Sequence, residues 1–144
     1  MRISTKGRYG MAVMVCLAEN PGQQQTAVDI AKKLGISKIY LEQVLSLLKN
    51  AGLVQSVKGS QGGYFIDTTT DKITALDILK ATETGLFERT EVSLDEPSAY
   101  IEKAVQNTVW EPLDKAICSF LKSTTLKAVL DNSKTMGTGY MFYI

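Results

Sequence analysis

Three segments in the first part of the chain place apolar residues at helical spacing. From Gly7 to Leu17 nearly every residue after Arg8 is apolar, which predicts a helix that is buried on all sides. Residues 26–34 and 37–48 each begin with a hydroxyl residue suited to an N-cap and then repeat apolar positions at i, i+3, i+4 and i+7. Because only Gly35-Ile36 separates these two segments, they predict a helix-turn-helix.

A β-hairpin and a further short helix are predicted next. The alternating run Leu53 to Val57 and the segment Tyr64 to Ile66 are predicted to be strands, joined by the basic, glycine-rich Lys58 to Gly63. Thr74 to Ala81 then has helical spacing, with Thr74 and Asp77 as its capping residues. A helix-turn-helix followed by such a hairpin is typical of a winged helix.

The rest of the chain predicts a connecting loop, dimerisation helices and a tail. Residues 82–97 hold several acids and few apolar anchors, which indicates a loop. Residues 98–136 carry a long apolar stripe at helical spacing, kinked or interrupted at Pro112, followed by a last short helix. A small domain cannot cover so long a stripe, so we expect a second copy of the chain to cover it. Residues 137–144 form the tail, which begins with a mobile Gly137 to Gly139.

The predicted fold class is therefore mainly α with a small β-hairpin. A winged helix-turn-helix DNA-binding domain occupies residues 1–81, and a long C-terminal dimerisation helix follows the loop.

Composition disfavours most enzyme mechanisms. The chain of 144 residues has no histidine and only two cysteines, so it lacks the usual general base and cannot form a four-thiolate metal site. No apolar run approaches the roughly 18 residues of a membrane span, and the N-terminus lacks the apolar stretch of a signal peptide, so we expect a cytoplasmic protein. The net charge is +1, but residues 1–66 carry +5, which leaves −4 for the remainder. A basic first half predicts contact with a polyanion.

The outward side of the second helix of the helix-turn-helix holds candidates for reading DNA bases. Because the core face uses the apolar positions, Lys38, Ile39, Tyr40, Glu42 and Gln43 are left to point outward. Gln can pair with an adenine edge, Glu can accept from a cytosine amine, and an apolar side chain can contact a thymine methyl group. The alternative is an ordinary solvated helix face.

Two further groups are candidates for contacts with the DNA backbone. The wing tip places a basic side chain beside glycines, which suits close approach to a groove, although such turns are also common in hairpins. Basic residues precede and open the first helix, where they either hold phosphates or form a surface charge cluster. These candidates are Lys58, Gly59 and Gln61 in the wing and Arg2, Ser4, Thr5, Lys6 and Arg8 at the N-terminus.

Several segments resemble one family of bacterial winged-helix repressors, which includes IscR, NsrR and CymR. They are Met1 to Gly10, Tyr40 to Gln43, Asn50 to Val54, Lys58 to Tyr64, Ala75 to Ile78 and Ser123 to Leu126. The resemblance implies a homodimer on a near-palindromic double-stranded DNA operator, with Tyr40, Glu42 and Gln43 on the recognition helix and Lys58 in the wing. Ile39 departs from the small polar residue of IscR, which affects the base preference and not DNA binding itself.

The resemblance also bears on cofactors and cysteines. Cluster-binding members of the family use three closely spaced cysteines between the short helix and the long one, whereas residues 82–97 contain none. We therefore expect no iron–sulfur cluster held in the family manner and no other cofactor. Cys16 is expected to be an inert thiol buried in the first helix, whereas Cys118 is placed near the dimer seam, where a redox role stays open.

The C-terminal residues predict a second partner. Tyr140 to Ile144 resembles the end of the CymR-type members, which repress cysteine metabolism with cysteine synthase as corepressor. That enzyme also accepts the C-terminal isoleucine of serine acetyltransferase, which implies docking of Tyr143 and Ile144 in the same site. The alternative is that the tail packs on its own domain. Two other functions stay open: a redox- or metal-responsive sensor, and a winged helix that binds only proteins.

Overall fold

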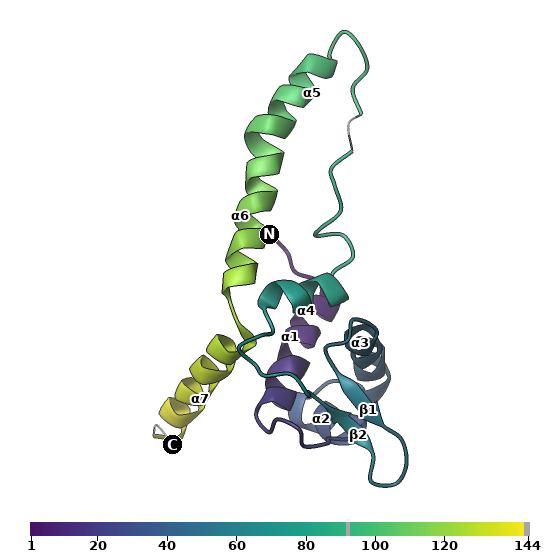
Figure 1. Ribbon diagram of the computed structural model, residues 1–144, viewed down its shortest axis with the longest axis vertical. Coiled ribbons are helices and arrows are strands. Elements are labelled where there is room, and N and C mark those ends of the chain that lie inside the picture. The colour runs from purple at the N-terminus through teal and green to yellow at the C-terminus, as the bar shows by residue number, and fades with distance from the viewer. Residues whose placement is uncertain (92, 143–144) are drawn as a thin grey trace.

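The computed structural model describes residues 1–91 and 93–142, the last four by their backbone only (Figure 1). Helices dominate, and the sheet found among these residues is a two-stranded antiparallel hairpin, which confirms the predicted fold class. None of the helices described is long and apolar enough to cross a membrane. The elements are α1 (Thr5–Ala18), α2 (Ala27–Leu34), α3 (Lys38–Asn50), β1 (Gln55–Val57), β2 (Gly63–Phe65), α4 (Ala75–Thr82), α5 (Ala99–Val105), the π-helical η1 (Gln106–Trp110), α6 (Glu111–Ser123) and α7 (Leu126–Phe142).

The core of the winged-helix body forms around α1. No residue from Tyr9 to Ala18 is exposed, as the uninterrupted apolar pattern predicted. Met14 and Leu17 are fully buried together with Ile30 of α2 and Leu41 of α3. Burial of each such side chain contributes about 1.5–3 kcal/mol, so the contacts of α1 with its neighbours hold the helix-turn-helix in place.

Local hydrogen bonds start the helices at the predicted residues. The side chains of Thr26 and Ser37 each accept a hydrogen bond from the amide three residues later, at 3.1 and 3.3 Å. Thr74 and Asp77 form a reciprocal capping box at the start of α4. Gly35 ends α2 at a φ of 68°, a left-handed conformation that glycine adopts without a steric penalty.

The hairpin is anchored to the body by Gln25, which precedes α2. Gln25 forms an isolated bridge with Tyr64 of β2 through two backbone hydrogen bonds of 2.8 and 2.9 Å. A Cβ atom on Gly63 would lie 2.7 Å from the carbonyl oxygen of Gln25, and one on Gly62 would lie 2.0 Å from that of Val57. Gly62 is therefore required by the close backbone packing within the hairpin, and Gly63 by the packing of β2 against Gln25.

The loop between α4 and α5 lacks regular structure at every position described, from Glu83 to Ser98 without residue 92. Glu102 of α5 holds it by accepting hydrogen bonds from the amides of Ser93 and Leu94, at 2.9 and 2.6 Å. These amide bonds lower the pKa of the Glu102 carboxyl.

From α5 through η1 to α6 the chain forms one long rod that extends away from the winged-helix body (Figure 1). The interruption predicted at Pro112 takes the form of the π-helical segment directly before it. Proline has no amide hydrogen to donate, and a π turn shifts the hydrogen-bond ladder at this point. Large apolar side chains remain exposed along the rod, namely Ile101, Val109, Leu113 and Phe120.

The last helix is longer than predicted. α7 continues through Gly137 to Gly139 as far as Phe142, where we expected a short helix followed by a mobile linker. Each residue added to an existing helix gains a backbone hydrogen bond, which offsets the low helix propensity of glycine. Leu126 and Leu130 of α7 lie in the core of the winged-helix body, so this part of residues 98–136, which the sequence predicted to serve dimerisation, packs against its own chain.

Candidate DNA-binding surface

Helix α3 has one buried face and one exposed face. Its buried face consists of Leu41, Val44, Leu45 and Leu48, which have no solvent exposure. On the other side Lys38, Glu42 and Gln43 are exposed, and the large apolar side chain of Ile39 is 75% exposed. Lys38 and Glu42 form an ion pair of 3.7 Å, and at this exposure such a pair stabilises a helix by only about 0.2–0.5 kcal/mol. All four side chains are therefore accessible to a groove of DNA.

Tyr40 differs from these neighbours because it is half-buried. Its ring meets that of Tyr9 edge to face, with 5.4 Å between the ring centroids and an interplanar angle of 89°. Such a pair contributes about 0.5–1.5 kcal/mol beyond the area it buries. Tyr40 thus joins the start of α3 to the N-terminal half of α1, a structural role that the sequence pattern of α3 did not reveal.

The hairpin lies below α3 in Figure 1, and its tip is at the end of the molecule opposite α5. Lys58, Gly59 and Gln61 are all exposed there, and Gly59 has a φ of 110°. The structure thus brings the wing candidates and the α3 candidates to the same part of the molecule.

The N-terminal candidates surround a hollow of about 670 Å³ at the start of α1. Arg2, Thr5 and Arg8 line it, while Lys6 is exposed but does not. Ser4 is the N-cap, and its hydroxyl accepts a hydrogen bond of 3.1 Å from the amide of Gly7. The hydroxyl of Ser4 is therefore committed to the helix.

Glu83 is a residue of this hollow that sequence reasoning missed. Its carboxylate accepts a hydrogen bond of 2.7 Å from the amide of Ser4, which ties the end of α4 to the start of α1. A carboxylate at this position already uses an amide that would otherwise be available to a phosphate. The two residues are 79 positions apart, so no local pattern indicates the contact.

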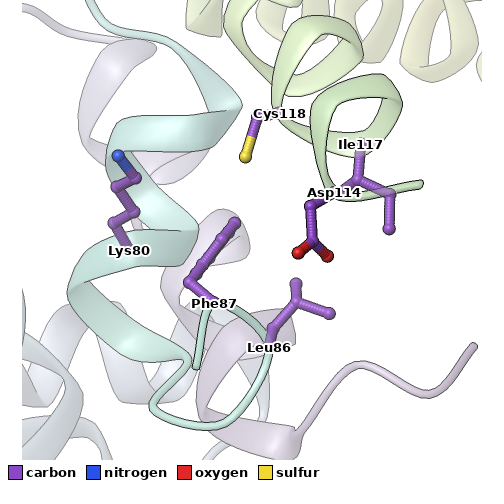
Figure 2. Close-up of a pocket in the computed structure, with 6 residues that line it drawn as sticks. All are labelled: Lys80, Leu86, Phe87, Asp114, Ile117 and Cys118. Carbon is purple, nitrogen blue, oxygen red and sulfur yellow. The ribbon is translucent and has the colours of Figure 1, made fainter. Parts of the chain in front are cut away.

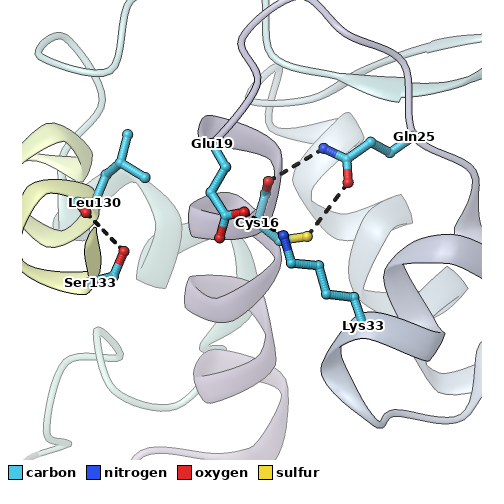
Figure 3. A network of polar contacts seen from close by, with 6 residues as sticks. All are labelled: Cys16, Glu19, Gln25, Lys33, Leu130 and Ser133. Atoms are coloured by element: carbon cyan, nitrogen blue, oxygen red, sulfur yellow. Dashed lines mark hydrogen bonds and ion pairs between the residues drawn. The ribbon is translucent and has the colours of Figure 1, made fainter. Parts of the chain in front are cut away.

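A network of polar contacts surrounds Cys16 at the end of α1 (Figure 3). The thiol donates to Oε1 of Gln25 at 3.6 Å, and Nε2 of Gln25 donates to the carbonyl oxygen of Cys16 at 3.4 Å. An ion pair between Lys33 and Glu19 lies beside them. Burial raises the pKa of the Cys16 thiol, so it stays protonated at neutral pH and fits the inert thiol predicted.

Cys118, the other cysteine, is half-exposed on α6. It lies on the side of α6 that faces α4, near Lys80, as Figure 2 shows. Tyr143 and Ile144, the two partner-binding candidates of the tail, lie outside the described residues.

Comparison with known proteins identifies the family of this chain. Residues 3–132 match the Rrf2 family, described as iron-dependent transcriptional regulators. The chain belongs to the Rrf2 family. It is 41% identical to the HTH-type transcriptional regulator CymR of Bacillus subtilis, over the full length of both chains. The HTH-type transcriptional regulator IscR of Erwinia tasmaniensis is 33% identical, and the match covers 94% of this chain and 82% of IscR.

The fold of this Rrf2 protein is also that of solved relatives. The structure of CymR, described as the global cysteine regulator of B. subtilis, superposes with a TM-score of 0.74 and 38% identity, over 92% of this chain and 98% of that one. The chain is thus a DNA-binding transcriptional regulator of the CymR and IscR type. Its family is not one of enzymes, as the composition predicted.

The residues present do not fit an iron–sulfur cluster held by thiolates. Cys16 is buried in α1, Cys118 lies on α6, and the loop after α4 contains no cysteine. Across residues 1–91 and 93–138, no three side chains of His, Cys, Asp or Glu lie together in a way that suits a metal ion.

Proposed function

We propose that the chain acts as a homodimeric repressor that binds a near-palindromic double-stranded DNA operator, with α3 of each copy in the major groove. The observation that carries this proposal is the exposure of Ile39 and Gln43 on a helix whose opposite face is fully buried. Ile39 offers an apolar contact for a thymine methyl group, and Gln43 offers a donor and an acceptor for adenine. Glu42 accepts from cytosine once it leaves Lys38.

The wing and the N-terminal segment contact the DNA backbone in this proposal. Lys58 and Gln61 reach it from the wing, where Gly59 allows close approach. Arg2, Thr5, Lys6 and Arg8 reach it from α1, whereas Ser4 acts by capping that helix. Such contacts fix the position of the protein on the duplex and carry no sequence information.

We expect Gln43→Ala to weaken operator binding by roughly 1–3 kcal/mol and to relax base preference at one position in each half-site. Lys58→Ala and Arg8→Ala should instead weaken binding to all sequences alike and lower the slope of log affinity against log salt by about one each. Fluorescence anisotropy with operator and random duplexes over a range of salt concentrations measures both effects.

Lys103→Ala is the matched control, because Lys103 is exposed on α5 at the opposite end of the molecule from α3 (Figure 1). Its salt slope should equal that of the unaltered protein. Equal affinity of the unaltered protein for operator and random DNA at moderate salt would contradict the proposal.

Two copies of the chain are proposed to pair along the rod from α5 to α6. The support is an exposed apolar stripe on this rod, whose side chains are 37–67% exposed to solvent. It consists of Val109, Trp110, Leu113 and Phe120. A monomeric protein seldom leaves so continuous an apolar stripe in water. Two-fold symmetry of the pair requires the near-palindromic operator.

Control of cysteine metabolism, with cysteine synthase as corepressor, is the proposed biological role. It is supported by the 41% identity with CymR over its full length and by the description of CymR as a global cysteine regulator. Leu130 is the last buried residue of α7 with a described side chain, and the helix continues for about 12 residues to Phe142, or roughly 18 Å. Gly137 and Thr138, where the tail begins, are exposed, so an enzyme can reach this part of the chain.

Deletion of Tyr143 and Ile144 should abolish the complex with cysteine synthase, because it removes the aromatic and aliphatic anchors and displaces the terminal carboxylate. Isothermal titration of cysteine synthase into the shortened and the full-length protein measures this. O-acetylserine should release the enzyme from the full-length protein, since both occupy one site. Unchanged binding after the deletion, or a complex insensitive to O-acetylserine, would refute this role while leaving DNA binding intact.

A further inference from the structure

A cavity of about 200 Å³ lies between α4, the start of the following loop and α6 (Figure 2). Lys80 of α4, Leu86 and Phe87 of the loop, and Asp114, Ile117 and Cys118 of α6 line it. Sites for drug-sized ligands measure about 300–1,000 Å³, so this one suits a smaller metabolite.

The cavity contains one cation and one anion that do not satisfy each other. Lys80 and Asp114 both line it, yet they form none of the ion pairs found among the described residues. A ligand that carries both a carboxylate and an ammonium group matches this pair of charges. Cys118 and the Phe87 ring face the space between them in Figure 2 and supply polarisable and apolar surface.

An apolar hollow of about 430 Å³ adjoins the cavity. Leu86 and Ile117 border both spaces, and the hollow is further lined by Leu79, Leu121 and, from the exposed apolar stripe, Phe120. Asp114, Ile117, Cys118 and Leu121 are spaced i, i+3, i+4 and i+7, so they share the face of α6 that looks toward α4. The polar cavity and the apolar hollow together suit a charged head with a short apolar side chain.

We propose that this site binds a free α-amino acid with a short apolar side chain. The ligand carboxylate pairs with the Lys80 ammonium, its ammonium pairs with the Asp114 carboxylate, and its side chain packs over Leu86 and Ile117. The two charged residues are exposed, so solvent screening keeps the affinity in the millimolar range.

The position of the site connects it to DNA binding. α4 packs against both α1 and α3, and on its other side against α6. A ligand between α4 and α6 therefore contacts the rod and the helix that supports the recognition helix. Any effect of the bound ligand on DNA affinity rests on the proposed DNA-binding function, whereas binding of the ligand itself does not.

The test is titration of the full chain with L-valine, L-leucine and L-methionine by isothermal calorimetry, and with two derivatives of leucine. N-acetyl-L-leucine lacks the ammonium group and L-leucinamide lacks the carboxylate. At about pH 6.5 the amine of leucinamide is still protonated. We expect saturable binding of at least one of the free amino acids, and at least about tenfold weaker binding of leucine derivatives than of leucine.

Charge-matched variants locate the site. Lys80→Gln should weaken leucine about tenfold but leave leucinamide unchanged, and Asp114→Asn should weaken leucine but leave N-acetyl-L-leucine unchanged. Lys115→Gln is the control, because Lys115 is exposed on α6 and does not line the cavity. Leucine should also slow alkylation of Cys118 by iodoacetamide.

Two results would overturn the proposal. One is the absence of saturable binding for all three amino acids up to about 50 mM, well above the millimolar dissociation constant expected for such a site. The other is a loss of affinity in Lys80→Gln that is the same for leucine and leucinamide. Either result leaves the DNA-binding proposal untouched, because that is measured with DNA alone.

Discussion

Leu113→Glu combined with Phe120→Glu should convert the protein into a monomer and reduce operator affinity at least about 100-fold. Both side chains belong to the exposed stripe of α6, at 47% and 67% exposure, and a pair of buried glutamates without partners would oppose pairing of two copies. A monomer holds one half-site only, so it loses the gain from linking two binding events. Analytical ultracentrifugation and anisotropy with the operator measure the two effects.

Lys115→Glu is the control for this double variant. Lys115 lies about 200° around α6 from Leu113, so an acid there points away from the stripe. This variant should stay dimeric, and both proteins should keep their helical circular dichroism because none of the three residues is buried in the chain. A double variant that remains dimeric at micromolar concentration would refute pairing along α6.

Leu126→Ala should lower the free energy of unfolding by about 2–5 kcal/mol. Leu126 has no solvent exposure and starts α7, whose first amide donates to the carbonyl oxygen of Ile73 at 2.8 Å. Removing a fully buried leucine loses its transfer free energy and leaves a cavity. Urea denaturation at one fixed protein concentration measures the change, because dimerisation makes the apparent stability depend on concentration.

The matched control lies on the same helix. Met136 is 66% exposed, so Met136→Ala should change the free energy of unfolding by less than about 0.5 kcal/mol. A loss of stability in Leu126→Ala as small as that in Met136→Ala would show that α7 does not belong to the core.

Much of the winged helix was predictable because it depends on neighbours in the sequence. The caps at Thr26, Ser37 and Thr74 act over three residues, and the apolar spacing of α2 and α3 states directly which face is buried. The positions of α3 that fall outside this apolar spacing were predicted to face outward. Among them are Ile39 and Gln43, which are exposed in the structure.

The contacts that the sequence did not predict are those between residues distant in the chain. The half-buried position of Tyr40 depends on Tyr9, and the amide of Ser4 is occupied by Glu83. The bridge between Gln25 and Tyr64 explains the need for Gly63, where the sequence suggested only a turn or an approach to DNA.

By itself, the sequence determined the helix-turn-helix and the hairpin, because caps, turns and apolar periodicity are short-range properties. The family followed from motifs that resemble those of known repressors. Only the tertiary structure decided that α7 enters the core through Leu126, since its apolar spacing suits burial against any partner. It alone also brought Lys80 and Asp114 to one cavity. Contacts between distant segments depend on how whole helices pack, and helical periodicity identifies the face to be buried but not the surface that covers it.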